Sequence, residues 1–358
     1  MSETDLKDEN IKKSSPKMTI FNIVLIIAIF VGLLIYMFSV DEIDNIIYLL
    51  QNVNYVWVIA GLFCLIGVWL CESITLYIPL KNMYPNHRFS TSIRASMIGQ
   101  LFNNITPFSS GGQPMQAYDL TKTGVRVSDS LSALAMKFII TQIALIVFTL
   151  SVVIFQFNFF MHIFQDFLWI VILGFAINII AIIFVILMGV KKNFIIFITT
   201  PFIKLLGKFH IGKWHIFKDV DATISRFEGS VENFHQQFLN MKAHKKMVLQ
   251  IFIVSFIQSL LYYSITYMVY RAFGNSGTSF FQIITVQSFL LLIMTFVPTP
   301  GSGLGAEGGF LLLFNSIFTN GTINLSILFW RIYTFYLPII VGALFLIPRK
   351  RGKTDKNL

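Results

Sequence analysis

The chain has 358 residues, of which 55% are hydrophobic and 12% are charged, and its formal net charge is +10. Soluble domains carry about 25% charged residues. This composition, with a mean hydropathy of +0.73, therefore excludes an ordinary soluble protein and indicates a polytopic membrane protein. The two cysteines, Cys64 and Cys71, share one apolar run and are expected to act as small apolar residues rather than as a disulfide.

Six apolar runs are long enough to cross a bilayer, which takes about 20 residues of helix. They are predicted at Thr19–Phe38, Tyr55–Pro79, Ser128–Phe157, Phe164–Val190, Met247–Tyr270 and Ile323–Ile347. Residues 1–18 are polar and predict a disordered cytoplasmic tail, and residues 348–358 form a basic tail. The sequence thus predicts an all-α membrane domain over residues 19–347.

The positions of the basic residues predict the orientation. The 27 lysines and arginines lie, with three exceptions, in the two tails and in the segments 81–94, 122–126 and 191–246. The exceptions are Lys137, Arg271 and Arg331. Cytoplasmic loops carry an excess of Lys and Arg, and all these segments fall on one side if both termini are cytoplasmic. We therefore interpret the net charge as a topology signal and expect no nucleic-acid partner.

Two connecting segments differ in character. Val40–Asn54 contains three acidic residues and no lysine or arginine, and is expected to be a loop on the outer side. Residues 191–246 are basic, and the apolar residues of Trp214–Met241 have helical spacing. We interpret the second segment as cytoplasmic and interfacial, lying on anionic lipid. A solvated linker helix is the alternative.

Two stretches interrupt the helical pattern. Ala95–Leu120 contains Pro107, Gly111 and Gly112, and Phe280–Asn320 contains Pro298, Pro300, Gly301, Gly303, Gly305, Gly308 and Gly309. Pro removes a backbone donor and Gly weakens a helix, and broken backbone at membrane depth is tolerated only where protein or a water-filled cavity covers it. Each stretch begins and ends on one side. We therefore predict two broken re-entrant elements that enter from opposite faces, as in an inverted repeat.

Four charged residues lie within or beside the apolar runs: Glu72, Lys137, Glu307 and Arg331. Such a charge costs about 2–3 kcal/mol at a helix centre on insertion scales, which makes each a functional candidate. Basic groups and helix N-termini could hold a lipid phosphate, and Glu307 could receive a positive headgroup. The alternatives are a structural Glu307–Arg331 ion pair and a Lys137 that reaches the membrane surface as an anchor.

Other kinds of site are not expected. The glycines of the two stretches could let backbone amides approach a phosphate or allow hinge motion, and close helix packing is the alternative. The segment Gly301-Ser-Gly-Leu-Gly lacks a preceding strand and a Walker lysine, so it does not predict a nucleotide site. The six histidines have no metal-ligand spacing, and no Ser/His/Asp set is evident. We therefore expect no metal, no cofactor and no catalytic residue.

Two motifs carry a resemblance to a known family. They are Thr106-Pro107…Gly111-Gly112-Gln113-Pro114-Met115-Gln116-Ala117-Tyr118 and Val297-Pro298-Thr299-Pro300-Gly301…Gly305-Ala306-Glu307-Gly308-Gly309. Together they resemble the lysylphosphatidylglycerol synthase transmembrane family, the flippase part of the multiple peptide resistance factor, from about Phe21 to Ile347. Many relatives carry Gly-Glu-Pro and a following Arg in the first motif, where this chain has Gln113 and Gln116.

The resemblance implies a flippase that moves an anionic or aminoacylated phospholipid, or another lipid-linked substrate, across a bacterial cytoplasmic membrane. The candidate substrate-binding residues are Glu307, Arg331, Lys137, Glu72, Gln113, Thr106 and Tyr118. In the full-length factor a cytosolic domain transfers lysine from tRNA to phosphatidylglycerol. No such domain is recognised in this sequence, so aminoacyl transfer is the second hypothesis. The third is a scaffold for a separate lipid- or glycan-modifying enzyme, and an oligomer is compatible with all three.

Overall fold

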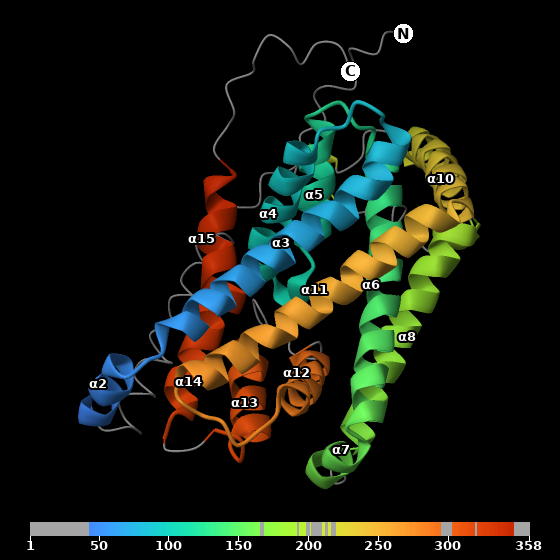
Figure 1. The fold of residues 1–358 in the computed structure, drawn as a ribbon. Helices are drawn as coiled ribbons and strands as arrows, with labels where there is room; N and C mark the ends of the chain where they lie inside the picture. Colours follow the sequence, from blue (N-terminus) through green and yellow to red (C-terminus); the bar gives the residue numbers. More distant parts are fainter. Residues whose placement is uncertain are drawn as a thin grey trace.

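The computed structural model describes residues 43–164, 168–191, 193–197, 201, 210–211, 214–215, 220–294, 303–318 and 321–346, and these form a helical bundle (Figure 1). Five helical segments in this part of the chain are long and apolar enough to cross a membrane. They are α3 (Tyr55–Met83), α6 (Val127–Phe155), α8 (Leu168–Val190), α11 (Lys245–Ala272) and the nearly continuous α14–η5–α15 (Ile323–Arg331, Ile332–Tyr336 and Leu337–Leu344). The all-α membrane fold is confirmed, whereas the first expected span and both tails lie outside the described residues.

Helices α3 and α11, which contact each other more extensively than any other pair of described elements, run side by side through the bundle (Figure 1). Small residues allow their backbones to approach closely, as is common between membrane helices. A Cβ added at Gly67 would lie 2.8 Å from Leu261 Cδ1, so the glycine provides the space for the leucine. Gly61 performs the same role for Tyr333 of η5, whose hydroxyl donates to the Val58 carbonyl at 2.8 Å. The last span is thereby attached to the N-terminal half of α3.

The stretch 95–120 forms a hairpin of two helices at the upper end of the bundle in Figure 1. The first helix, α4 (Phe89–Ile105), ends before Pro107, and a short 3₁₀ turn, η2 (Pro107–Ser109), leads to α5 (Gly112–Thr121). Phe108 and Ser109 have φ values of 54° and 51°, in the left-handed region that non-glycine residues rarely adopt. The chain therefore reverses here at two strained residues, and the two helices return to the end from which they started.

The stretch 280–320 forms the second hairpin, from α12 (Phe280–Met294) and α13 (Gly303–Phe314), at the lower end of the bundle (Figure 1). Residues 295–302, which include the expected hinge residues Pro298, Pro300 and Gly301, lie outside the described residues. Its core is aromatic: Phe310 and Phe314 are fully buried and stack with ring centroids 4.5 Å apart. Phe310 also packs against Trp330 of α14, with ring centroids 5.2 Å apart, and this contact holds the hairpin against the last span.

The element order repeats with opposite direction. α3, the α4–α5 hairpin and α6 follow one another as long helix, broken hairpin and long helix. The same sequence returns as α11, the α12–α13 hairpin and α14–η5–α15, starting from the other end of the bundle (Figure 1). The two first helices of the units, α3 and α11, are packed against each other. This is the arrangement expected of an inverted repeat.

Two connecting segments differ from their predictions. The expected loop 40–54 contains a short helix, α2 (Ile43–Gln51), because its isoleucines and leucines recur at helical spacing and give the helix one apolar face. In the basic segment the helix α10 (Val220–Ala243) begins six residues later than Trp214. Trp214 and His215 instead form strand β2, which pairs antiparallel with β1 (His210–Ile211). A further short helix, α7 (Phe157–Phe164), follows α6.

Candidate functional site

The first cluster of charged side chains surrounds Glu72, in the middle of α3. Lys137 of α6 forms an ion pair and a hydrogen bond with Glu72 Oε1, and Gln258 of α11 donates its Nε2 to Glu72 Oε2 at 3.0 Å. Lys137 is only 7% exposed. A buried lysine in a bonded pair does not serve as an anchor at the membrane surface. Three spanning helices therefore meet at one carboxylate.

The α4–α5 hairpin reaches the same carboxylate through Gln116, which also forms a hydrogen bond with Glu72. Gln116 is buried against Gly99 of α4, where an added Cβ would lie 2.1 Å from Gln116 Nε2. The glycine is thus required for the approach of the amide. Gln116 thus brings a neutral amide to the carboxylate. The sequence singled out Gln116 in the first motif without placing it among the candidate substrate-binding residues, and it did not single out Gln258.

The second cluster is the ion pair between Arg331, the last residue of α14, and Glu307 of α13. Arg331 Nε lies 3.1 Å from Glu307 Oε1, and the arginine is 2% exposed. Its guanidinium carbon lies 5.3 Å from the ring centroid of Trp330 and 5.2 Å from that of Phe335, within the range of cation–π attraction. The structure thus brings together two of the predicted site residues, in a largely apolar surrounding.

The two clusters share helix α11. Gln258, which contacts Glu72, and Tyr262, which lies close enough to Arg331 to interact with its charge, are four residues apart. Side chains four apart lie on the same face of a helix, one turn from each other. One face of α11 therefore holds a residue bonded to the Glu72–Lys137 pair and a residue in the electrostatic range of Arg331. The Glu307–Arg331 pair was raised from the sequence, whereas the Glu72–Lys137 pair and its link to α11 are seen only in the fold.

Energetics limit what these pairs can contribute to folding. Burying two ions costs several kcal/mol of hydration free energy for each ion. The attraction between the buried ions often does no more than offset this cost. Removing one partner, by contrast, costs about 3–5 kcal/mol because a buried charge remains. A membrane protein gains little stability from such pairs. Charges that are retained inside spans are therefore functional candidates by default.

The remaining candidates of the first hairpin have local partners. Thr106 donates to the Phe102 carbonyl at 2.6 Å and accepts from the Gly111 amide at 2.8 Å, so it closes the break after α4. Gln113 is exposed, and Tyr118 lies under the ammonium of Lys122 at 4.1 Å. None of these three side chains has a contact to either charge pair among the interactions of the described residues.

The glycines of the first hairpin are needed for space rather than for an unusual backbone. Gly111 has a φ of −80°, which any residue adopts. A Cβ at Gly111 would lie 2.6 Å from Thr106 Cγ2, and one at Gly112 would lie 2.0 Å from Asn103 Oδ1. That Asn103 oxygen accepts from the Gly112 amide at 3.1 Å. Close packing, the alternative raised from the sequence, therefore describes this pair of glycines.

The glycines of the second hairpin differ from those of the first. Gly308 is exposed, and a Cβ added there would meet no described atom within 4 Å. Gly305 and Gly309 are half-buried on the same helix, and Gly303 is its first residue. Packing against the described residues therefore does not explain Gly308, which follows Glu307 on α13.

A third ion pair joins the two arms of the first hairpin. Arg94 Nε of α4 lies 3.2 Å from Asp119 Oδ1 of α5, and the Asp119 side chain is 6% exposed. The other carboxylate oxygen of Asp119 is buried and has no hydrogen-bond partner among the described residues. The sequence did not single out this pair. Both residues lie close to basic loops, where charged residues are usually exposed at the surface.

Fold and site together define a class: a multi-pass helical membrane protein whose spans carry buried charge pairs between two broken hairpins of opposite direction. The chain belongs to the lysylphosphatidylglycerol synthase TM region family, whose model matches residues 23–342. It is also similar to a UPF0104 membrane protein of Archaeoglobus fulgidus, with 22% identity over 333 residues, which cover 89% of this chain and 94% of the relative. The resemblance predicted from the two motifs is thereby confirmed.

Proposed function

We propose that this protein is a flippase, which moves an anionic or aminoacylated phospholipid between the leaflets of a bacterial cytoplasmic membrane. The observation that carries the proposal is the buried Arg331–Glu307 pair, 3.1 Å apart, held between a broken hairpin and a spanning helix. Transporters place substrate sites near the midplane between broken helices of an inverted repeat. The family description, which names lysylphosphatidylglycerol, supports a lipid substrate.

The chemistry of the pair suits a zwitterionic or cationic lipid headgroup. A guanidinium binds a phosphate through charge-assisted, often bidentate hydrogen bonds. When a lipid phosphate takes the place of the Glu307 carboxylate at Arg331, the released carboxylate can receive the amine of an aminoacylated headgroup. Because both ions exchange one partner for another, neither is left uncompensated inside the membrane, and the cost of an isolated charge is avoided.

The cluster around Glu72 offers further polar groups to a lipid headgroup. Gln258 Oε1 is buried and has no hydrogen-bond partner among the described residues, although its Nε2 is bonded to Glu72. A buried acceptor without a donor costs about 1–3 kcal/mol, and a headgroup amine or hydroxyl would satisfy it. We infer that Lys137 and Glu72 act as a second charge pair along the route. Thr106, Gln113 and Tyr118 remain proposed contacts at the first hairpin, where a lipid would enter.

The orientation is part of the proposal. With both termini in the cytoplasm, the ends of α3, α10 and α11 that carry the basic residues face the inner leaflet. The α4–α5 hairpin would then open to the inner leaflet and the α12–α13 hairpin to the outer one. Membrane phospholipids are the proposed partners, and a separate lipid-modifying enzyme could supply the substrate.

Leaflet exchange in liposomes tests the function. Purified protein is reconstituted, and the accessibility of labelled phosphatidylglycerol and lysyl-phosphatidylglycerol to a membrane-impermeant quencher is followed over time. We expect exchange with the wild type and none with Glu307→Gln, provided that its thermal unfolding in detergent shows a folded protein. Protein-free liposomes and labelled phosphatidylcholine are the controls. A folded Glu307→Gln that exchanges lipid at the wild-type rate would refute the role of Glu307.

The two alternative hypotheses make different predictions. Aminoacyl transfer predicts newly formed lysyl-phosphatidylglycerol in lipid extracts of cells that express this chain alone. A scaffold predicts co-purification of a lipid- or glycan-modifying enzyme and no exchange by the isolated protein. Either result, together with an absence of exchange for every lipid tested, would replace the flippase proposal.

A further inference from the structure

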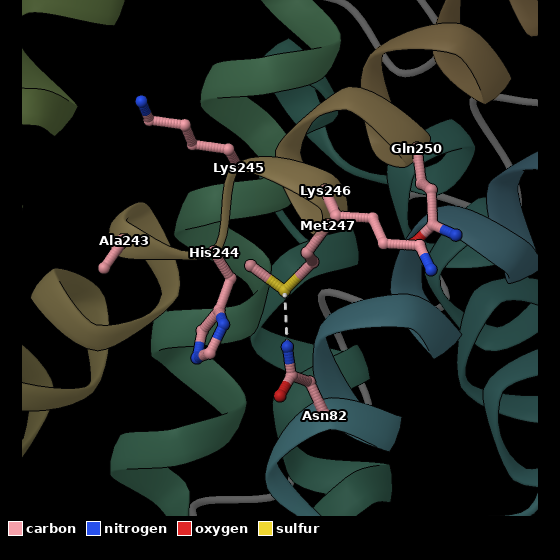
Figure 2. Close-up of a pocket in the computed structure, with 7 residues that line it drawn as sticks. All are labelled: Asn82, Ala243, His244, Lys245, Lys246, Met247 and Gln250. Carbon is pink, nitrogen blue, oxygen red and sulfur yellow. Dashed lines mark hydrogen bonds between the residues drawn. The ribbon is translucent and has the colours of Figure 1, made fainter.

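A polar cavity lies at the junction of α10 and α11, beside the end of α3 (Figure 2). Its volume is about 480 Å³, and it is lined by Asn82, Ala243, His244, Lys245, Lys246, Met247 and Gln250. A second cavity of about 310 Å³ shares three of these residues and is lined by Asn82, Met83, Gln237, Asn240, Ala243 and His244. Small-molecule sites occupy about 300–1,000 Å³, so the cavities have the size of a lipid headgroup site.

The described lining residues are rich in hydrogen-bond donors and include no carboxylate. Two lysines, a histidine and four amide side chains surround the two cavities. The N-terminus of α11 adds to this field, because His244 at its N-cap makes no side-chain capping bond and the first amides of a helix lack intrahelical acceptors. A cavity lined by two lysines and several amide donors, with no carboxylate among the described lining residues, favours an anion.

Figure 2 shows how the side chains are arranged. The His244 ring and the Asn82 carboxamide lie below Met247, and Asn82 Nδ2 donates to Met247 Sδ at 3.5 Å. Lys246 and Gln250 are one turn apart on α11, and their side chains extend in the same direction, whereas Lys245 points away. Lys246 is therefore the cation best placed to act together with the amides.

The cavity is also connected to the central charge pairs by two helices. Asn82 lies ten residues after Glu72 on α3, and Gln250 lies eight residues before Gln258 on α11. At 1.5 Å per residue these separations are about 15 and 12 Å. The same two helices that line the cavity thus contact each other at the Glu72 cluster.

We propose that this cavity binds the phosphate of an anionic phospholipid headgroup at the membrane surface, before the lipid reaches the buried pairs. The order of the two steps, first binding in the cavity and then transfer to the buried pairs, rests on the proposed flippase function. The binding itself can be measured without transport. A phosphate diester supplies the negative charge that Lys246 and the α11 N-terminus require, and its glycerol hydroxyls match the amides of Asn82 and Gln250. A free phosphate ion has the same charge chemistry, so the test separates the two sources.

The experiment measures binding of dihexanoyl-phosphatidylglycerol, below its micelle concentration, to the purified full-length chain by isothermal titration calorimetry. We expect Lys246→Gln to weaken this binding about tenfold and Ala243→Phe, which fills the cavity without a change of charge, to abolish it. Lys191→Gln removes the same charge from an exposed position outside the cavity lining and should have no effect. Equimolar inorganic phosphate should not compete with the lipid.

Three results would overturn the proposal. Unchanged binding in Lys246→Gln and Ala243→Phe would show that the lipid binds elsewhere. An equal loss in Lys191→Gln would show general surface attraction, and full competition by inorganic phosphate would assign the cavity to the free ion. Lost binding with intact leaflet exchange would remove the cavity from the transport route and leave the flippase proposal standing. Retained binding without leaflet exchange would support the cavity and count against the flippase.

Discussion

Gln258 and Tyr262 lie one turn apart on α11, and the first donates to Glu72 at 3.0 Å while the second interacts with the charge of Arg331. Helix α11 therefore has one residue beside each of two buried charge pairs, which come from α3 and α6 and from α13 and α14. In an inverted repeat this is the first helix of the second unit. A movement of one unit relative to the other would change both clusters together.

The Glu72–Lys137 pair predicts an asymmetric response to mutation. Lys137→Met leaves the Glu72 charge in a buried place, so we expect a loss of about 3–5 kcal/mol in the free energy of unfolding. Glu72→Gln combined with Lys137→Met removes both charges and should lose much less. Thermal unfolding in detergent, compared across the single and double variants, measures the difference. Equal losses would show that the pair is exposed to water in the folded protein.

Gly342 of α15 predicts a strong packing effect. A Cβ at this position would lie 2.7 Å from the Met97 carbonyl oxygen and 2.8 Å from Leu101 Cβ on α4. Because backbone cannot yield as a flexible side chain does, Gly342→Ala should destabilise the protein by about 1–3 kcal/mol, as expected of overpacking. Gly308→Ala, in open space on α13, is the matched control and should be neutral or up to about 1 kcal/mol stabilising through helix propensity. Equal unfolding midpoints for the two variants would contradict the close approach of α15 and α4.

The fold could be predicted from the sequence to a large extent, because the long apolar runs and the two glycine- and proline-rich stretches carry local signals. The helical hairpin 95–120 and the pairing partners Glu307 and Arg331 are examples. The Glu72–Lys137 pair and the amides of Gln116 and Gln258 could not be predicted, because they meet through packing of helices far apart in sequence. Gly111 and Gly112 suggested either a hinge or close packing, and the residues with positive φ at the reversal are Phe108 and Ser109. The contacts of these two glycines with Thr106 and Asn103 determine where the chain reverses.

His87, in the connection between α3 and α4, predicts a pH dependence of stability. It is 7% exposed and its Nε2 lies 2.8 Å from Ser92 Oγ. Burial and the nearby Lys81 lower the pKa of His87 from 6.5 to about 4. The unfolded chain therefore takes up the proton first, so this contribution to stability is complete above about pH 6.5 and is lost as the pH falls towards 4.

The corresponding measurement compares thermal unfolding of the wild type and His87→Gln at pH 7.5 and at pH 4.5. Glutamine can still reach Ser92 but does not titrate. We expect the wild type to lose more stability than the variant between the two values. An identical loss in both would show that His87 is not responsible for the acid sensitivity.

The neutralised pair Glu307→Gln/Arg331→Gln in the liposome exchange assay tests the central claim most directly. The double variant keeps the size of the Glu307 side chain, shortens that of Arg331 and leaves neither charge of the pair behind, so a loss of transport cannot be attributed to a stranded ion. We predict a folded protein with an unfolding midpoint close to that of the wild type and no exchange of labelled phosphatidylglycerol or lysyl-phosphatidylglycerol above protein-free liposomes. Exchange at the wild-type rate by the folded double variant would show that the buried pair is structural and would contradict the proposed transport site.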